Sequence, residues 1–496
     1  MSCVQSVTAK ISNWIHEKEV ITRTQEVAVL VTQTAIRILF IMSSILMAAA
    51  VFPLSMHGVI IPLVGCSATL SSAFLFQESN DGPWFGELPP LLKPAVPQEN
   101  GQMPADFPVD APRPLKNRGT CNCQLNSIVS MIESIPQVAH WVRHPLRDDV
   151  DQAGFDQFLA GYNVPAQVVA DFTAYVNLQP HPRPTIPDLF ETFLNYQNDP
   201  NGYQPAPADR FGFNKIKLIY ENLRILSPAL ARFFGAYDEA LQGNLAEVGL
   251  TTQVIRVALN KINDRISANP CVQIDAAEPL TYIFDLLPDH LKMSVETTYN
   301  LKMDGLPPLL EARAPTQERV TFFTLEFDDH DANPNLTAIV QNYMTNEGNI
   351  EPVRSVGIDG AVHSYPVRNR SVSLLEPPPY LIFHLKRFRY EEPPQSWVTK
   401  ILSSIFRRLN PQFIKKDAPV SSPNELEINT VAGPRRYRLA SFVNHIGKTC
   451  NSGHYVAGRE VNGQKYFASD EEISFLDQGG WDSMHRNAYL LCYLPV

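Results

Sequence analysis

Cys123 stands where the sequence predicts the start of a helix. Apolar residues follow it at helical spacing, namely Leu125, Ile128, Val129 and Ile132. A thiol at a helix start lies near the positive end of the helix dipole and near unpaired backbone N–H groups, which lower its pKa and favour the thiolate. The same N–H groups can stabilise an oxyanion. Cys123 is therefore a candidate nucleophile, although a cysteine at such a position is more often a small buried residue.

His454 and Asp470 lie on either side of a predicted β-hairpin. The dipeptide Asn462-Gly463, set between two strand-like runs, is a strong signal for a two-residue hairpin turn. His454 comes eight residues before this dipeptide and Asp470 seven after it. The folded hairpin therefore brings the two nearly opposite one another, with an offset that a bulge can absorb. An aspartate beside a histidine can hold it toward a thiol, as in Cys-His-Asp triads, and a surface polar contact is the alternative.

The composition restricts the class of protein. A chain of 496 residues is longer than one typical core requires, so two or more regions are expected. A net charge of -10 argues against a nucleic-acid binder, because phosphate contacts need clustered Lys and Arg. The seven cysteines form no C-x-x-C pair and no dense framework, so neither a structural zinc site nor a disulfide scaffold is expected. The sequence predicts no metal and no cofactor.

Two uncharged segments, 38–54 and 59–76, dominate the N-terminal region. Each is roughly the ~20 residues that cross a bilayer, and only four residues separate them, so residues 35–77 are predicted to form a two-helix membrane hairpin after a polar segment, 1–34. Lys and Arg residues flank the hairpin and place both its ends in a cytosol. A cleaved signal peptide ending at Ala48–Ala50 and a buried helical pair containing Pro53 and Pro62 are the alternatives.

Residues 78–114 are rich in proline and show little periodicity, which predicts an extended linker. The remaining 115–496 are predicted to form one α+β domain. Apolar residues recur at helical spacing between Ile216 and Ile266, whereas the pattern from about Val320 onward predicts strands and Gly-rich turns.

Four segments of this domain carry motifs in a fixed order. They are Asn117 and Gly119 followed by Cys123-Gln124-Leu125-Asn126-Ser127; Gln273 to Glu278; Leu385 to Phe388; and His445, Gly447, Gly453-His454-Tyr455 with Asp470. Over residues 115–496 these segments resemble the boxes of the ubiquitin-specific protease family (USP, of UCH type), whose members are deubiquitinases. The strand Ala488 to Tyr493 also looks like the last strand of that family.

The resemblance implies a papain-like USP fold, in which a helical thumb carries Cys123, a palm sheet carries His454 and Asp470, and strand fingers grip ubiquitin. It implies hydrolysis of the isopeptide bond after the C-terminal Gly of ubiquitin on conjugated proteins, with these three residues as the catalytic triad. It further assigns oxyanion or support roles to Asn117, Asn122 and Glu471, and contacts with the ubiquitin tail to Gln273, Asp275, Gly453 and Tyr455. A protease for another ubiquitin-like modifier and an inactive ubiquitin-binding scaffold are the alternatives.

Three features depart from the family pattern. One extra residue lies between Gly119 and Cys123, which leaves the oxyanion donor open and makes Cys121 a rival nucleophile. The paired cysteines of many family fingers are missing, so the fingers are expected to fold without metal. A helical insertion is expected between Cys123 and Gln273. In the third box, Lys386 and Arg387 are expected to be exposed.

The predicted hairpin joined to such a protease also resembles the inclusion-membrane effectors of obligate intracellular bacteria. That resemblance implies a catalytic domain facing host cytosol at a pathogen vacuole. A deubiquitinase of a eukaryotic organelle membrane is the alternative.

Overall fold

The computed structural model describes residues 112–117, 121–144, 146, 150–179, 183–195, 205–207, 209–241, 251–311, 314–328, 333–345, 351–391, 412–449 and 452–496. The predicted segment 1–34, the predicted membrane hairpin 35–77, residues 78–111 of the predicted linker, Gly119 and Cys450 lie outside these residues. Among the helices of the described ranges, none combines the length and the apolar character that a membrane crossing needs.

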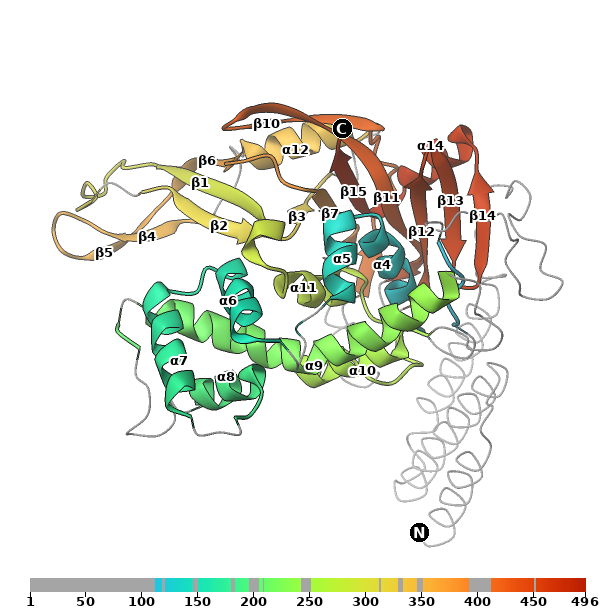
Figure 1. The fold of residues 1–496 in the computed structure, drawn as a ribbon. Helices are drawn as coiled ribbons and strands as arrows, with labels where there is room; N and C mark the ends of the chain where they lie inside the picture. Colours follow the sequence, from blue (N-terminus) through green and yellow to red (C-terminus); the bar gives the residue numbers. More distant parts are fainter. Residues whose placement is uncertain are drawn as a thin grey trace, which may run out of the picture. The chain divides into compact units, whose positions relative to one another are not determined.

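Helices fill the first half of the described chain and confirm the expected helical insertion. They are α4 (Cys123–Glu133), α5 (Pro136–Arg143), α6 (Gln152–Gly161), α7 (Ala166–Leu178), α8 (Ile186–Asn195), α9 (Arg210–Leu241), α10 (Gln253–Ile262) and α11 (Ala277–Asp285), followed by the short 3-10 turn η3 (Asp289–Leu291). The long helix α9 buries a stripe of residues at three- and four-residue spacing, Tyr220, Leu223, Leu226 and Leu230. Helices α6, α7 and α8 lie together beside α9 (Figure 1), joined by edge-to-face aromatic contacts such as Phe172 with Phe190.

Strands form the second half. They are β1 (Met293–Leu301), β2 (Thr316–Val320), β3 (Phe323–Leu325), β4 (Val353–Val356), β5 (Val362–Tyr365), β6 (Val367–Leu374), β7 (Leu381–Leu385), β8 (Phe388–Glu391), β9 (Gln412–Lys415), β10 (Glu425–Thr430), β11 (Gly433–Thr449), β12 (Ser452–Val461), β13 (Gln464–Ser469), β14 (Glu472–Leu476) and β15 (Ala488–Pro495). Among the described residues, the helices α12 (Leu336–Met344) and α14 (Gln478–His485) lie between these strands.

One large sheet runs in the order β14-β13-β12-β11-β10-β6-β1-β2, and β15 joins β11 to β7. In the middle of β11 every residue is buried. The reason is that α4 and α14 both pack on β11 and on its neighbour β12. At the other end of the sheet β1, β2 and β6 extend outward toward the small β4–β5 hairpin (Figure 1). This arrangement is the expected α+β order of helices followed by antiparallel strands.

The strand region begins earlier than the sequence predicted. Strand β1 starts at Met293, well before Val320. Among its first residues, only Met293 and Val295 are buried apolar side chains. The rest of β1 is polar or half-exposed, so its apolar alternation is too weak to be recognised in the sequence.

Arg387 corrects a second expectation. It lies between β7 and β8 and is only 1% exposed. Its guanidinium donates to four backbone carbonyls, those of Ala488 (2.6 Å), Ala418 (2.9 Å), Arg486 (2.8 Å) and Lys416 (3.2 Å). Arg387 is therefore a structural cation of the sheet core, whereas Lys386 is exposed as predicted and pairs with Glu326.

Candidate active site

Cys123 is the first residue of α4, as the apolar spacing predicted. The helix packs on β11 and β12, so the thiol is only 3% exposed. Burial raises the pKa of Cys123 to about 12, against the lowering effect of the backbone N–H groups of Tyr455 and Gln124. The lowered pKa expected from the helix start is therefore wrong for this conformation, because loss of hydration outweighs the helix terminus.

The Asn462-Gly463 turn has the predicted hairpin geometry. Both residues have positive φ (51° and 81°), and Val461 pairs with Gln464 across the turn. The register continues to the pair Ala457 with Ala468. Beyond it, Nε2 of His454 lies 3.8 Å from Oδ2 of Asp470. The hairpin thus brings these two predicted residues together.

Asp470 itself occupies the two-residue turn between β13 and β14, with φ of 54°. Its carboxylate accepts one hydrogen bond from Asn126 of α4 and one from Asn117, both at 2.7 Å. Its backbone carbonyl accepts from the N–H of Leu115 at 2.9 Å. Burial raises the pKa of Asp470, while His454 and the two amides act in the opposite direction and favour the carboxylate.

Ser469 is a neighbour of the imidazole that the sequence analysis missed. Its hydroxyl lies 2.9 Å from Nε2 of His454, closer than Oδ2 of Asp470, which lies 3.8 Å from the same nitrogen. A serine next to the predicted aspartate was visible in the sequence. Only the register of β13 against β12 shows that it faces the ring.

The predicted oxyanion donors lie in the segment that leads into α4. Asn117 accepts from the N–H of Asn122 at 2.7 Å while its amide donates to Asp470. The side chain of Asn122 is fully buried, does not cap α4, and donates to Oε1 of Gln253 at 3.2 Å. Thr252, just before α10, likewise does not cap its helix and donates to Oδ1 of Asn126 at 2.9 Å. At both positions the side chain therefore bonds another segment of the site instead of capping its own helix.

The predicted tail-binding residues fall into two groups. Gln273 lies 3.4 Å from Nε2 of His445, and Tyr455 packs edge-on against the same imidazole. Gly453 has φ of 152°, and a Cβ there would collide with the carbonyl of Ile446 and the ring of His445. Gln273, Gly453 and Tyr455 thus gather around one buried histidine. Burial lowers the pKa of His445 to about 3, so this ring is neutral.

Asp275 belongs to the second group. Its carboxylate accepts from the hydroxyl of Tyr489 at 2.7 Å and from the N–H of Ala277 at the start of α11 at 2.8 Å. These contacts hold α11 against β15. Glu471 occupies the turn beside Asp470, where its charge disfavours the neighbouring carboxylate. Cys121, the rival nucleophile, is partly buried and bonds through its backbone to Pro270 and Arg256. Among the described residues no group of His, Cys, Asp and Glu is suited to a metal ion.

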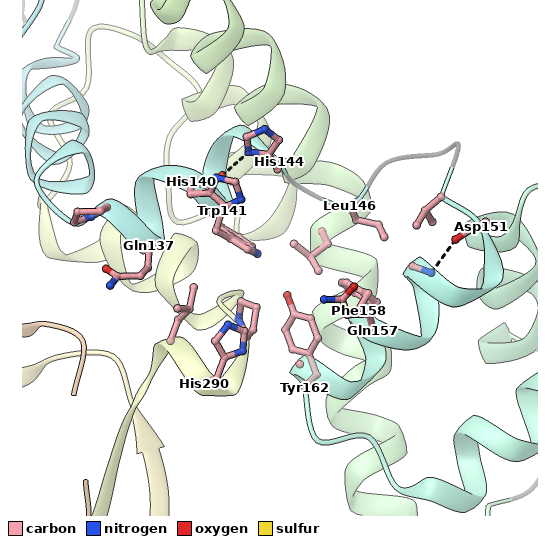
Figure 2. A pocket seen from close by; sticks show the side chains of 17 residues that line it. Gln137, His140, Trp141, His144, Leu146, Asp151, Gln157, Phe158, Tyr162 and His290 are labelled. Carbon is pink, nitrogen blue, oxygen red and sulfur yellow. Dashed lines mark hydrogen bonds between the residues drawn. The ribbon is translucent and has the colours of Figure 1, made fainter. Parts of the chain in front are cut away.

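A cavity of about 1080 Å³ lies elsewhere, between α5, α6 and η3. His140 and Trp141 of α5 and Phe158 and Tyr162 from the end of α6 face one another across it (Figure 2). None of the predicted catalytic, support or tail-binding residues lines this cavity. It is therefore separate from the candidate active site.

Comparison with known proteins identifies the family. The family model of ubiquitin carboxyl-terminal hydrolase matches residues 114–493, well over half of the chain. No curated protein sequence matches the chain. Among solved structures, the SAGA DUB module of Ubp8, Sgf11, Sus1 and Sgf73 bound to monoubiquitin matches with 15% identity and a TM-score of 0.42, covering 86% of this chain and 75% of that one.

The same module bound to ubiquitin aldehyde matches with 15% identity and a TM-score of 0.40, covering 77% of this chain and 69% of that one. A yeast SAGA DUB module with a variant Sgf73 matches with 14% identity and a TM-score of 0.38, covering 82% and 71%. The assignment itself rests on the family match, which spans Cys123, His454 and Asp470. The chain belongs to the ubiquitin carboxyl-terminal hydrolase family and is a cysteine-type deubiquitinase.

Proposed function

We propose that this chain hydrolyses the isopeptide bond after the C-terminal glycine of ubiquitin on conjugated proteins, with Cys123, His454 and Asp470 as its catalytic triad. One observation carries the proposal. The carboxylate of Asp470 lies 3.8 Å from Nε2 of His454 and is bonded at 2.7 Å to Asn126, three residues beyond Cys123 on α4. A single carboxylate therefore links the histidine of the sheet to the helix that carries the thiol.

The proposed reaction has two steps. Nδ1 of His454 accepts the thiol proton, and the sulfur of Cys123 attacks the carbonyl carbon of the last glycine of ubiquitin. The imidazolium returns the proton to the lysine nitrogen, so that the C–N bond breaks and a thioester remains. Water then attacks the thioester and gives its proton to His454, the S–C bond breaks, and the thiolate is protonated again. Asp470 stabilises the imidazolium in both steps.

Tail recognition is proposed for the group around His445. The φ of Gly453 and the missing Cβ keep that backbone against the imidazole, and Tyr455 adds an aromatic wall. The absence of a side chain at Gly453 suits the passage of a tail of two glycines, which also carry no side chains. For the oxyanion, the N–H groups at the start of α4 are the proposed donors, since the amide of Asn117 is directed to Asp470 and the amide of Asn122 to α10.

The test is reaction of the full chain, purified in detergent, with ubiquitin carrying a C-terminal electrophile. We expect one covalent adduct in the wild type and in Cys121→Ala, and none in Cys123→Ala. An adduct that survives Cys123→Ala contradicts the nucleophile, and no adduct in any form favours the ubiquitin-binding scaffold. Probes built on other modifiers with a Gly-Gly tail, used in parallel, identify the preferred modifier.

We also propose that residues 38–76 anchor the chain in a membrane as a two-helix hairpin, with the catalytic domain on the cytosolic side. The support is the absence of charge in segments 38–54 and 59–76. In cells, the full chain should stay in the membrane pellet after alkaline carbonate extraction. A variant in which a Gly/Ser linker replaces 38–76 should not. Release of the full chain into the supernatant contradicts the anchor, and protease protection of the catalytic domain contradicts its orientation.

A further inference from the structure

Arg256 of α10 is a fully buried cation next to the candidate nucleophile, with 0% exposure. Its guanidinium makes four hydrogen bonds to uncharged oxygens. The acceptors are the carbonyls of Cys121 (2.9 Å), Ser267 (2.7 Å) and Val272, and Oδ1 of Asn122 (3.1 Å). Burial lowers the pKa of Arg256, and the thiols of Cys121, Cys123 and Cys271 are the groups whose charge acts against that effect. The guanidinium is thus bonded to the two residues that immediately precede Cys123.

The acceptors of this guanidinium belong to the two segments that form the site. Cys121 and Asn122 lead directly into Cys123, and Val272 directly precedes Gln273. The N–H of Cys121 donates to the carbonyl of Pro270, and this bond joins the same two segments. A planar guanidinium with donors on three nitrogens fixes such a junction more rigidly than any other side chain can.

A neighbouring residue of α10 holds the same segment. Oε1 of Gln253 accepts from the amide of Asn122, and the Gln253 amide donates to the carbonyl of Ala268 at 3.0 Å. Helix α10 is therefore hydrogen-bonded both to the segment before Cys123 and to the loop before Gln273. The segment before Cys123 is also where the chain carries one residue more than the family pattern, so an added anchor has a clear use there.

We propose that Arg256 is a positioning residue of the deubiquitinating reaction, which fixes the nucleophile segment against the Gln273 segment and places a positive charge that favours the thiolate of Cys123. The inference rests on Cys123 being the nucleophile. The groups facing this thiol are Asp470 from the β13–β14 turn and Cys121, which both disfavour its negative charge, and the N–H groups of Tyr455 and Gln124, which favour it. On the α10 side, the guanidinium of Arg256 is bonded to Cys121 and Asn122, the two residues before this thiol.

The chain offers a matched control. Arg387 is also buried, at 1% exposure, and its guanidinium also makes four hydrogen bonds to uncharged oxygens, all of them backbone carbonyls. Burial lowers its pKa to about 10. Its acceptors lie on residues 416, 418, 486 and 488, none of which belongs to the candidate site. Arg387→Lys should therefore affect stability as Arg256→Lys does, without affecting the thiol.

The experiment compares Arg256→Gln, Arg256→Lys and Arg387→Lys with the wild-type full chain in detergent. The readouts are kcat and KM on ubiquitin with a C-terminal fluorogenic amide, the rate of Cys123 alkylation by iodoacetamide at pH 8 followed by mass spectrometry, and Tm. In Arg256→Gln we expect kcat and the alkylation rate each to fall about tenfold, since a loss of about one pKa unit of stabilisation lowers the thiolate fraction tenfold. KM should change by less than about threefold, because uniform ubiquitin binding is retained.

Arg256→Lys keeps the charge and loses the forked geometry, so its alkylation rate should stay near wild type while kcat remains several-fold lower. Arg387→Lys should lower Tm and leave both rates unchanged. Equal rates in the wild type and Arg256→Gln, or equal losses in Arg387→Lys, overturn the inference. If Arg256→Gln cannot be recovered in a folded form, the kcat of Arg256→Lys is compared with that of Arg387→Lys. A lower kcat in Arg256→Lys alone supports the inference, and equal values overturn it. Because alkylation needs no ubiquitin, a wild type that fails the ubiquitin probe still reports the effect of Arg256 on the thiol.

Discussion

Asn126 and Asp470 join the two halves of the site, through a hydrogen bond of 2.7 Å from the amide of α4 to the carboxylate of the β13–β14 turn. The two residues are 344 positions apart in the chain. Thr252 holds the other end of the Asn126 amide, so its orientation is fixed. The position of the carboxylate beside His454 therefore depends on a residue of α4, the helix that begins at Cys123.

Asn126→Ala should lower kcat about 10- to 100-fold, because a lost hydrogen bond to a charged group costs about 1.5–3 kcal/mol. Steady-state kinetics on ubiquitin with a C-terminal fluorogenic amide measure this loss. Asn424→Ala is the control, since Asn424 also donates to an aspartate, Asp482, but at the sheet surface. Equal kcat in Asn126→Ala and the wild type contradicts the assigned role.

Ser469→Ala tests which neighbour orients His454. If Asp470 is the third member of the triad, Ser469→Ala should lower kcat less than about tenfold and Asp470→Ala about 10³-fold or more. The two variants are compared in kcat at the same pH. A loss in Ser469→Ala as large as in Asp470→Ala shows instead that the hydroxyl, 2.9 Å from Nε2, orients the imidazole.

Gly453→Ala should abolish activity and lower Tm, because its Cβ would meet the carbonyl of Ile446 and the ring of His445. Gly463→Ala is the matched control. Gly463 also has positive φ, 81°, but nothing lies within 4 Å of an added Cβ. It should cost only about 1–2 kcal/mol of backbone strain and leave kcat unchanged. Full activity in Gly453→Ala excludes the close approach of Gly453 to His445.

The pH dependence of Cys123 alkylation tests its burial. With a pKa near 12, the thiol is almost fully protonated at pH 7, and the thiolate fraction grows tenfold with each pH unit up to about 11. Iodoacetamide labelling of the ubiquitin-free chain should therefore accelerate throughout pH 7–10 without a plateau, followed at the Cys123 peptide. A plateau below pH 8 shows that the free enzyme already holds a thiolate.

The parts of the site that the sequence predicted are those with a local signal. Asn462-Gly463 fixes a hairpin register over a few residues, and that register places His454 beside Asp470. The start of α4 at Cys123 follows from the helical spacing of the apolar residues between Leu125 and Ile132. Both predictions needed only short-range pattern and turn chemistry.

Arg256 and Arg387 could not be predicted in the same way. Each donates to carbonyls of residues that are distant in the sequence, such as Cys121 and Ala488, and arginine is usually solvent-exposed. Arg256 and Arg387 are buried because backbone carbonyls from other segments satisfy their donors, and such carbonyls leave no trace in the amino-acid sequence. The raised pKa of Cys123 has the same origin, since β11 and β12 bury the thiol.

The backbone bond from Leu115 to Asp470 has a mechanical consequence. Leu115 is among the first described residues and comes eight positions before Cys123. Tension that reaches Leu115 along the chain therefore loads the turn that holds Asp470 before it reaches α4. Pulling a single molecule from its N-terminus should displace the carboxylate from His454 at forces that leave the sheet folded, and so switch off hydrolysis by load alone.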